Sequence, residues 1–314
     1  MALLTRVREA QGGFVAIGDL GADSSSLMSE LDELEAFGFQ IERHPYHGIA
    51  YRGPSARLCP DQIEWNIGTR VIGRRIAVWN RVGSTNDLAA RASTSRANEG
   101  LAILAEEQTS GRGSRGRVWS APAGSSILMS ILLFPRRPLD DPGWLTALGA
   151  VAVSEVLSEE FDLDARIKWP NDVRVGEAKV SGILVERASG TVLGIGLNVN
   201  TVAEAFPEEL RDSATSLRRL LCRPVDRSEL ARSILKRLDR HYTRAIDDGP
   251  EALGIAYGLR SEHSGRRVEV WTKDGAIVGR LETIGLLDGL TLSPSENPPR
   301  KIVLRDVLKI VNIT

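Results

Sequence analysis

The spacing of apolar residues changes twice along the 314-residue chain, and this constrains the fold more than any single motif does. Over residues 1–60 apolar positions recur at helical intervals and end in two short runs. From about residue 65 short apolar runs alternate with longer helical patterns, and after Gly265 the period becomes two. Since a period near 3.6 predicts helix and a period of two predicts strand, we expect three units of different architecture.

The first unit, residues 1–60, combines two predicted helices with a predicted hairpin. The second helical pattern ends at Gly38, and the runs Phe39–Arg43 and Gly48–Arg52 then flank His44-Pro-Tyr-His47. Two helices followed by such a hairpin are typical of a winged helix-turn-helix. The spacing of His44 and His47 suits a metal ion, but a wing turn is the better interpretation.

The second and third units differ in how strands and helices alternate. Residues 65–262 interleave strands such as Ser126–Phe134 with helices such as Leu145–Glu160. This predicts an α+β unit with a central mixed β-sheet and helices mainly on one face. Residues 263–314 hold short runs of period two separated by Gly, Asp and Pro, which predicts a small SH3-like β-barrel.

Charge and hydropathy exclude several classes of protein. The 41 acidic and 40 basic residues give a net charge of −1, which excludes a basic field over the whole chain for nucleic acid. The apolar stretches Ile127–Phe134 and Ala147–Val153 are well short of the roughly 18 residues of a membrane helix. Met1–Ala10 lacks the pattern of an export signal. Cys59 and Cys222 have no metal spacing and are expected to be reduced thiols of a cytoplasmic protein.

A glycine- and arginine-rich run is the first motif that carries chemistry. Between Gln108 and Trp119 stand three glycines and three arginines within seven residues, 111–117. Glycines allow successive N–H groups to turn toward one anion, and arginines add charged donors for phosphate or carboxylate. The spacing matches neither a P-loop nor a dinucleotide fingerprint. Trp119 is placed to stack on a purine, and the alternative is a merely polar surface loop.

Two lysines mark the next motifs, although only six of the 40 basic residues are lysines. In Lys168-Trp-Pro-Asn171-Asp172 a tight turn would present a cation, an amide and a carboxylate together. Lys168 suits a phosphate, and Asp172 suits Mg²⁺ or a ribose hydroxyl. The alternative is an ordinary hairpin turn with solvated charges. Lys179 precedes an apolar strand, where a lysine usually needs an acidic partner such as a bound carboxylate or phosphate.

Two further segments complete the set. Gly194 and Gly196 alternate on a predicted strand and would let another group approach the backbone closely, with Asn198 supplying amide contacts. Ser84 and Thr85 precede a predicted helix, whose N-terminus suits a neutral polar group or a carboxylate.

Together these segments resemble those of the bacterial biotin protein ligases, including members with a DNA-binding head like that of the biotin operon repressor. The resemblance covers residues from about 75 to 314 and, more weakly, 1–60. It implies that residues 65–262 form the catalytic domain and bind biotin and ATP. Biotin and MgATP would give biotinyl-5′-AMP and pyrophosphate, and biotin would pass to a lysine of the biotin carboxyl carrier protein of acetyl-CoA carboxylase.

The resemblance also implies roles at matching positions. Lys179 and Arg112 are the implied catalytic residues, with Lys179 stabilising charge as the biotin carboxylate attacks the α-phosphate. The ligands of Mg²⁺ are not assigned. The implied biotin-binding residues are Ser84, Thr85, Asn86, Gln108, Arg112, Gly113, Ser114 and Lys179, and the implied nucleotide-binding residues are Arg115, Trp119, Lys168, Asn171, Asp172 and Asn198.

The chain departs from the family pattern at two places. Ser114 stands where the family loop usually has arginine, so either the adenylate is retained less firmly or Arg115 takes over. The segment Ser24–Ile41, which would read DNA, holds four acidic residues and no lysine or arginine. Because phosphate contacts supply most of the affinity for DNA, we expect a degenerate head that does not bind it.

Two other functions stay open at this point. One is a bifunctional biotin ligase and DNA-binding biotin operon repressor, which the acid-rich segment argues against. The other is a lipoate-type ligase on a related fold, against which the Lys-Trp-Pro-Asn-Asp segment argues. The sequence leaves the oligomeric state undetermined, a homodimer included.

Overall fold

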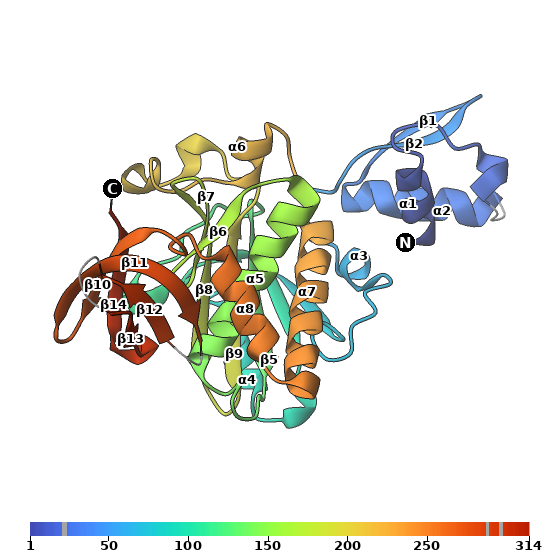
Figure 1. Ribbon diagram of the computed structural model, residues 1–314. Coiled ribbons are helices and arrows are strands. Elements are labelled where there is room, and N and C mark those ends of the chain that lie inside the picture. Colours follow the sequence, from blue (N-terminus) through green and yellow to red (C-terminus); the bar gives the residue numbers. More distant parts are fainter. Residues whose placement is uncertain (21–23, 287–288, 295–297, 314) are drawn as a thin grey trace.

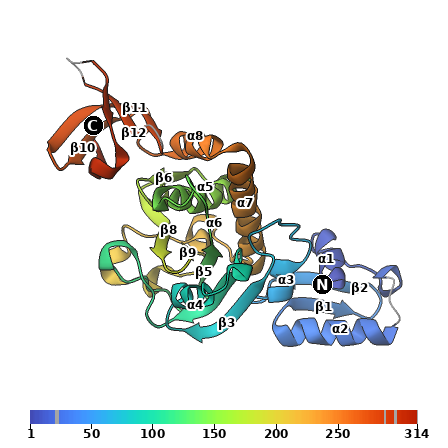
Figure 2. The same cartoon turned by 90° about the horizontal axis from the view of Figure 1, so that it is seen from below.

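The computed structural model describes residues 1–20, 24–286, 289–294 and 298–313. An N-terminal unit and a C-terminal sheet lie on opposite sides of a larger central part (Figures 1 and 2). No helix within the described ranges is both long and apolar enough to cross a membrane.

The central part is built on a seven-stranded mixed sheet of order β3-β4-β5-β9-β8-β7-β6. Strands β3 and β4 run parallel, and each further neighbouring pair runs antiparallel. This confirms the predicted α+β class with a central mixed sheet. The bounds are β3 Ile76–Val82, β4 Ala102–Gln108, β5 Ser126–Leu133, β6 Ala165–Lys168, β7 Asp172–Val175, β8 Ala178–Arg187 and β9 Thr191–Asn198.

Helices cover both faces of this sheet, but unequally. The long helices α5 (Pro142–Phe161), α7 (Arg227–Asp248) and α8 (Glu251–Arg260) lie on one side, and the short α4 (Thr85–Ala92) packs on the other (Figure 1). Strand β5 is consequently buried at all eight of its positions, which explains why six of its eight residues are apolar. Two five-residue helices, α3 (Pro60–Glu64) and α6 (Leu217–Leu221), fill the connections.

The N-terminal unit has its own small core. Helix α1 (Ala2–Glu9) and helix α2 (Ser24–Phe37) pack with the antiparallel hairpin of β1 (Gln40–His44) and β2 (Gly48–Gly53). The hairpin agrees with the predicted runs. The buried side chains come from both helices and the hairpin, and include Leu3, Leu4, Val7, Leu27, Leu31, Leu34, Phe39 and Ile49.

The C-terminal part is a five-stranded antiparallel sheet of order β13-β12-β11-β10-β14. Its last strand was not expected, because apolar residues in Val307–Asn312 are not strictly alternating and only two of the six are buried. The bounds are β10 Arg267–Thr272, β11 Gly275–Gly285, β12 Gly289–Ser293, β13 Arg300–Ile302 and β14 Val307–Asn312.

A buried carboxylate ties the three long helices together. Glu155 of α5 is 6% exposed, and its Oε2 lies 2.6 Å from Arg240 Nη2 and 2.8 Å from His241 Nε2. Arg260 of α8 lies 3.7 Å from its other oxygen. Burial alone would raise the pKa of Glu155, but the hydrogen bond with His241 and the arginine charges outweigh it and hold the pKa below the ordinary value of 4.5.

Replacing Glu155 with glutamine should therefore destabilise the fold. We expect a loss of about 2 kcal/mol at neutral pH, because the buried carboxylate accepts charged hydrogen bonds from the side chains around it, and these partners lose their counter-charge. Since the pKa of Glu155 is depressed by folding, its contribution is present above pH 4.5 and is lost as the pH falls through the folded-state value. Urea unfolding of the wild-type protein and of Glu155→Gln measures this effect. The difference between their free energies of unfolding should become smaller as the pH is lowered. Equal free energies at neutral pH would show that the Glu155 carboxylate does not stabilise the fold.

Candidate functional site

Two adjoining cavities lie on the sheet beside the loop that joins β4 to β5. We call this loop, residues 109–125, the Gly–Arg loop. The first cavity, the inner pocket, has a volume of about 40 Å³ and lies among α4, β8, β9 and the loop. The second, the outer groove, has a volume of about 1380 Å³ and lies between the central part and the C-terminal sheet. Both are lined by Ser114 and Asn171, so the two cavities meet there.

The residues singled out in the sequence gather at these two cavities. Every residue that the resemblance links to biotin lines the inner pocket, and most of those linked to the nucleotide line the outer groove. The inner pocket takes Ser84, Thr85, Asn86, Gln108, Arg112, Gly113, Ser114, Trp119, Asn171 and Lys179, and the outer groove takes Ser114, Arg115, Lys168, Asn171 and Asp172.

Asn198 is the exception. It is 6% exposed at the end of β9 and, within the described part of the chain, is not among the residues that line either cavity. Its Nδ2 instead donates to the carbonyl of Thr215 at 3.1 Å. The sequence could not reveal this, because strand alternation does not say which neighbour will satisfy a buried amide.

A network of uncharged polar groups forms one wall of the inner pocket. Gln108 Oε1 accepts hydrogen bonds from the backbone N–H of Thr85 at 2.7 Å and from its hydroxyl at 2.9 Å. Ser130 Oγ lies 2.7 Å from Thr85 Oγ1 and 2.5 Å from Asn86 Oδ1, so its single hydroxyl hydrogen is shared between these two acceptors. Ser130 is fully buried on β5 and had no motif to signal it. Since these groups are locked by one another, they present fixed donors and acceptors to a ligand.

Arg112 is held by two carboxylates, Asp87 and Glu186, to which the sequence assigned no role. Its Nη2 lies 2.9 Å from Glu186 Oε2 and 2.7 Å from Asp87 Oδ1. The hydrogen bonds from Arg112 lower the pKa of both carboxyl groups. Glu186 also accepts from Asn86 Nδ2 at 2.5 Å, so the guanidinium is connected to the polar wall of the pocket.

Lys179 lines the inner pocket together with Asn171, which also lines the outer groove. Its Nζ is 2.6 Å from Asp172 Oδ1 and 5.5 Å from the centre of the Trp119 ring. The backbone of Lys179 is bonded on both sides, to Ser213 and to Thr215. Such an ammonium, fixed near a carboxylate and open to a ligand, can stabilise developing negative charge.

Other groups approach the backbone of Gly194 and Gly196 on β9 closely, as predicted. These groups are side chains of the same chain, Asn86 and Trp119. A Cβ on Gly196 would lie 2.4 Å from Trp119 Cε2, and one on Gly194 would lie 2.5 Å from Asn86 Oδ1. Trp119 Nε1 is buried and has no hydrogen-bond partner among the described residues.

The inner pocket is small for a ligand site. Its volume is about 40 Å³, whereas ligand pockets usually measure about 300 Å³ or more, so its walls must move to admit a ligand.

The Lys-Trp-Pro-Asn-Asp segment forms the tight turn between β6 and β7. Asn171 is bonded twice to Ile183 of β8, through its backbone oxygen at 2.9 Å and its Nδ2 at 2.8 Å. Lys168 and Asp172 are paired across the turn and both line the outer groove. The predicted grouping of cation, amide and carboxylate is therefore present.

The Gly–Arg loop also contacts the C-terminal sheet. Arg115 Nη2 donates to the carbonyl of Leu308 on β14 at 3.2 Å. Ser114, the departure from the family pattern, accepts from Arg117 through its hydroxyl at 2.9 Å and its carbonyl at 3.2 Å.

Within the described ranges no cluster of three or more His, Cys, Asp or Glu could hold a metal ion. His44 and His47 lie in the β1–β2 turn, where His44 Nδ1 accepts two backbone N–H groups.

Comparison with known proteins gives consistent matches. Residues 78–200 match the model of the Biotin/lipoate A/B protein ligase family. The chain is 36% identical over 228 residues to the biotin--[acetyl-CoA-carboxylase] ligase of Mycobacterium tuberculosis, covering 68% of this chain and 83% of the relative. It is 29% identical over 295 residues to the bifunctional ligase/repressor BirA of Bacillus subtilis, covering 92% of this chain and 90% of the relative.

A solved structure matches the fold as well. The biotin protein ligase from Aquifex aeolicus in complex with biotin and ATP superposes with a TM-score of 0.67 and 27% identity. The match covers 76% of this chain and all of that one.

Proposed function

Because the chain belongs to the biotin protein ligase family, whose members join biotin to protein at the expense of ATP, we propose that its inner pocket binds biotin and its outer groove binds ATP. The observation that carries this assignment is the convergence on the inner pocket of every residue that the resemblance links to biotin. The fixed amide and hydroxyl groups of Thr85, Asn86 and Gln108 suit the neutral polar head of biotin, and Lys179 suits its carboxylate.

The reaction then follows from the junction of the two cavities. A carboxylate oxygen of biotin attacks the α-phosphorus of ATP, the bond to the bridging oxygen breaks, and pyrophosphate leaves. Lys179 stabilises the negative charge that develops on the phosphoryl oxygens, and Arg112 exchanges a carboxylate partner for the ligand. In the second step the amine of a carrier lysine attacks the mixed anhydride, loses a proton, and gives the biotinyl amide and AMP.

The remaining nucleotide contacts are assigned to the groove and its rim. Lys168 and Arg115 would neutralise phosphates, Asn171 would face the nucleotide, and Trp119 would lie against adenine. Asp172, an oxygen donor on the groove wall, fits Mg²⁺ arriving with ATP, and the ion would offset phosphate charge. Asn198 would contribute only if its bond to Thr215 is exchanged for the ligand.

We further propose the protein substrate and the roles of the outer parts. The name of the Mycobacterium tuberculosis relative supports the biotin carboxyl carrier protein of acetyl-CoA carboxylase as the acceptor. Residues 1–60 would be a winged-helix-like domain, 65–262 the catalytic domain and 263–314 an SH3-like barrel. The free thiols Cys59 and Cys222 support a place in the cytoplasm.

A direct test incubates the protein with ATP, biotin and a carrier domain and follows the mass of the carrier. We expect the addition of one biotinyl group that requires ATP and the acceptor lysine. Replacing biotin with lipoate should give no product. Transfer of lipoate instead of biotin would restore the lipoate-ligase interpretation.

Binding to an operator is the second candidate function, favoured by the match to the bifunctional ligase/repressor of Bacillus subtilis, which covers 92% of this chain. The electrostatics of that unit argue against it. Its five arginines all make contacts inside the chain: Arg6 donates to the carbonyl of Leu20, Arg8 pairs with Glu229, Arg43 with Asp32 and Glu35, Arg52 with Glu42, and Arg57 lies over Phe37. Few cations are left to neutralise phosphate.

We therefore expect no specific DNA binding by the full-length protein. A gel-shift titration against its own upstream DNA, with and without biotinyl-adenylate, measures this. Binding that saturates and survives about 150 mM salt with competitor DNA would establish the repressor function instead.

A further inference from the structure

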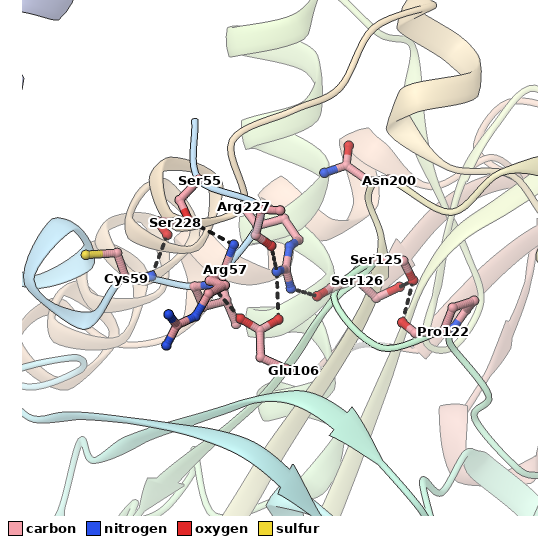
Figure 3. Close-up of polar contacts among 12 residues, drawn as sticks. Ser55, Arg57, Cys59, Glu106, Pro122, Ser125, Ser126, Asn200, Arg227 and Ser228 are labelled. Carbon is pink, nitrogen blue, oxygen red and sulfur yellow. Dashed lines mark hydrogen bonds and ion pairs between the residues drawn. The ribbon is translucent and has the colours of Figure 1, made fainter. Parts of the chain in front are cut away.

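Arg227, the first residue of α7, is a buried cation that the proposed reaction does not use. It is 2% exposed. Its guanidinium donates to the carbonyl of Ser126 at 3.1 Å, to Glu106 Oε2 at 2.7 Å and to the carbonyl of Ala56 (Figure 3). These three partners belong to β5, β4 and the segment that leaves the N-terminal unit, so one side chain joins three parts of the chain.

Glu106 is the counter-charge and has its own second set of contacts. Its Oε1 accepts from the backbone N–H of Leu58 at 2.6 Å (Figure 3), and its backbone carbonyl accepts from the N–H of Gly124 at 3.0 Å. The carboxylate is thus shared between Arg227 and the entering segment. Removing Glu106 would leave the buried charge of Arg227 without a counter-charge.

This pair lies where the Gly–Arg loop begins and ends. The β4–β5 ladder stops at the pair Ala105 and Leu128, and beyond it the two strands separate into the loop. Arg227 bridges the gap, because it holds Glu106 on the departing strand and Ser126 on the returning one. Gln108, which fixes Thr85 in the inner pocket, stands only two residues beyond Glu106.

Glu106 and Arg227 also bind the segment that connects the N-terminal unit to the central part. Ser55 Oγ donates to the carbonyl of Phe37 at the end of α2, and the N–H of Cys59 donates to Ser228 Oγ at 2.9 Å. Between them Ala56 and Leu58 contact Arg227 and Glu106. Figure 2 shows the N-terminal unit beside α3, next to the region where this segment enters the central part.

We propose that Glu106 and Arg227 are positioning residues for ligand binding, which fix the two ends of the Gly–Arg loop and couple that loop to the segment 55–59. This inference rests on the proposed binding of biotin and ATP at the loop. A loop that closes over ligands needs fixed ends, because otherwise its ligand-contacting residues do not reach the positions that binding requires. By reciprocity, ligands that order the loop also stabilise the contacts of Ala56 and Leu58.

The first test compares two buried carboxylates in the full chain, Glu106→Gln and Glu155→Gln. Both remove a buried counter-charge, but Glu155 lies among the long helices and does not line either cavity. We expect Glu106→Gln to raise the KM for biotin about 10-fold in pyrophosphate release with little change in kcat. Glu155→Gln should lower the unfolding midpoint but leave the KM unchanged. Equal KM values for both variants would overturn the proposal.

The second test follows amide hydrogen exchange in the peptide that covers Leu58 and Cys59. In the wild-type protein, saturating biotin and ATP should slow exchange there, and Glu106→Gln should abolish that ligand-dependent slowing. Exchange that does not respond to ligands in a wild-type protein that releases pyrophosphate would refute the coupling. A wild-type protein that releases none would instead refute the proposed function.

Discussion

Replacing Lys179 with alanine should reduce the formation of biotinyl-adenylate about 100-fold or more, because a preorganised charge at the reacting centre is lost. The Nζ atom lies 2.6 Å from Asp172 Oδ1, and the backbone N–H and carbonyl of Lys179 are both hydrogen-bonded, so the ammonium is held at the junction of the two cavities. Pyrophosphate release with biotin and ATP alone measures the step.

A lysine outside the site provides the control for this experiment. Lys273 is exposed in the turn between β10 and β11, and Lys273→Ala should leave pyrophosphate release unchanged. Lys179→Arg should recover little, since a planar guanidinium does not replace a compact ammonium. If Lys179→Ala released pyrophosphate at a near-normal rate, Lys179 would have no catalytic role.

Replacing Gly194 with alanine should weaken biotin binding about 100-fold, through a single added carbon. The new Cβ would lie 2.5 Å from Asn86 Oδ1 and 3.1 Å from its Nδ2. Asn86 has no room to yield, because Ser130 and Glu186 hold its amide from both ends. The polar wall of the inner pocket must therefore shift, and calorimetric titration with biotin measures the result.

Gly254 on α8 serves as the matched control for Gly194. A Cβ there would meet its nearest neighbour, a ring carbon of Trp144, at 3.4 Å, which is ordinary contact. Gly254→Ala should bind biotin like the wild-type protein. Unchanged biotin affinity in Gly194→Ala would mean that this wall does not contact biotin.

Local motifs were easier to predict than the contacts between distant segments. The turn at Pro170 and Asn171 and the close approaches to Gly194 and Gly196 follow from backbone rules that depend on a few neighbouring residues. Ser130 was missed because nothing near it in the sequence marks it, and the pairing of Arg112 with Asp87 and Glu186 was missed although both carboxylates stand in or beside the selected segments. Each gains its role from a partner brought in by the sheet, as when Glu186 meets Asn86, 100 residues away.

The same reasoning explains the missed elements of the fold. Helix α8 is hard to predict from the sequence, because its exposed face carries Ile255 and Leu259, which blur the amphipathic pattern. Strand β14 is hard to predict because its apolar residues do not alternate strictly and only two of its six residues are buried. The outer groove could not be foreseen at all, since one of its walls is made by residues of the C-terminal sheet, such as Leu308 and Lys309.

The small volume of the inner pocket bears on how fast the enzyme can capture its substrate. A space of about 40 Å³ with Trp119 seated on Gly196 is not open to free diffusion of biotin. Biotin must then either bind after the inner pocket has opened spontaneously, or bind weakly at the edge of the closed pocket before it opens. In either case the observed association rate rises with biotin concentration only to a plateau. At the plateau, the movement of Trp119 is the rate-limiting step.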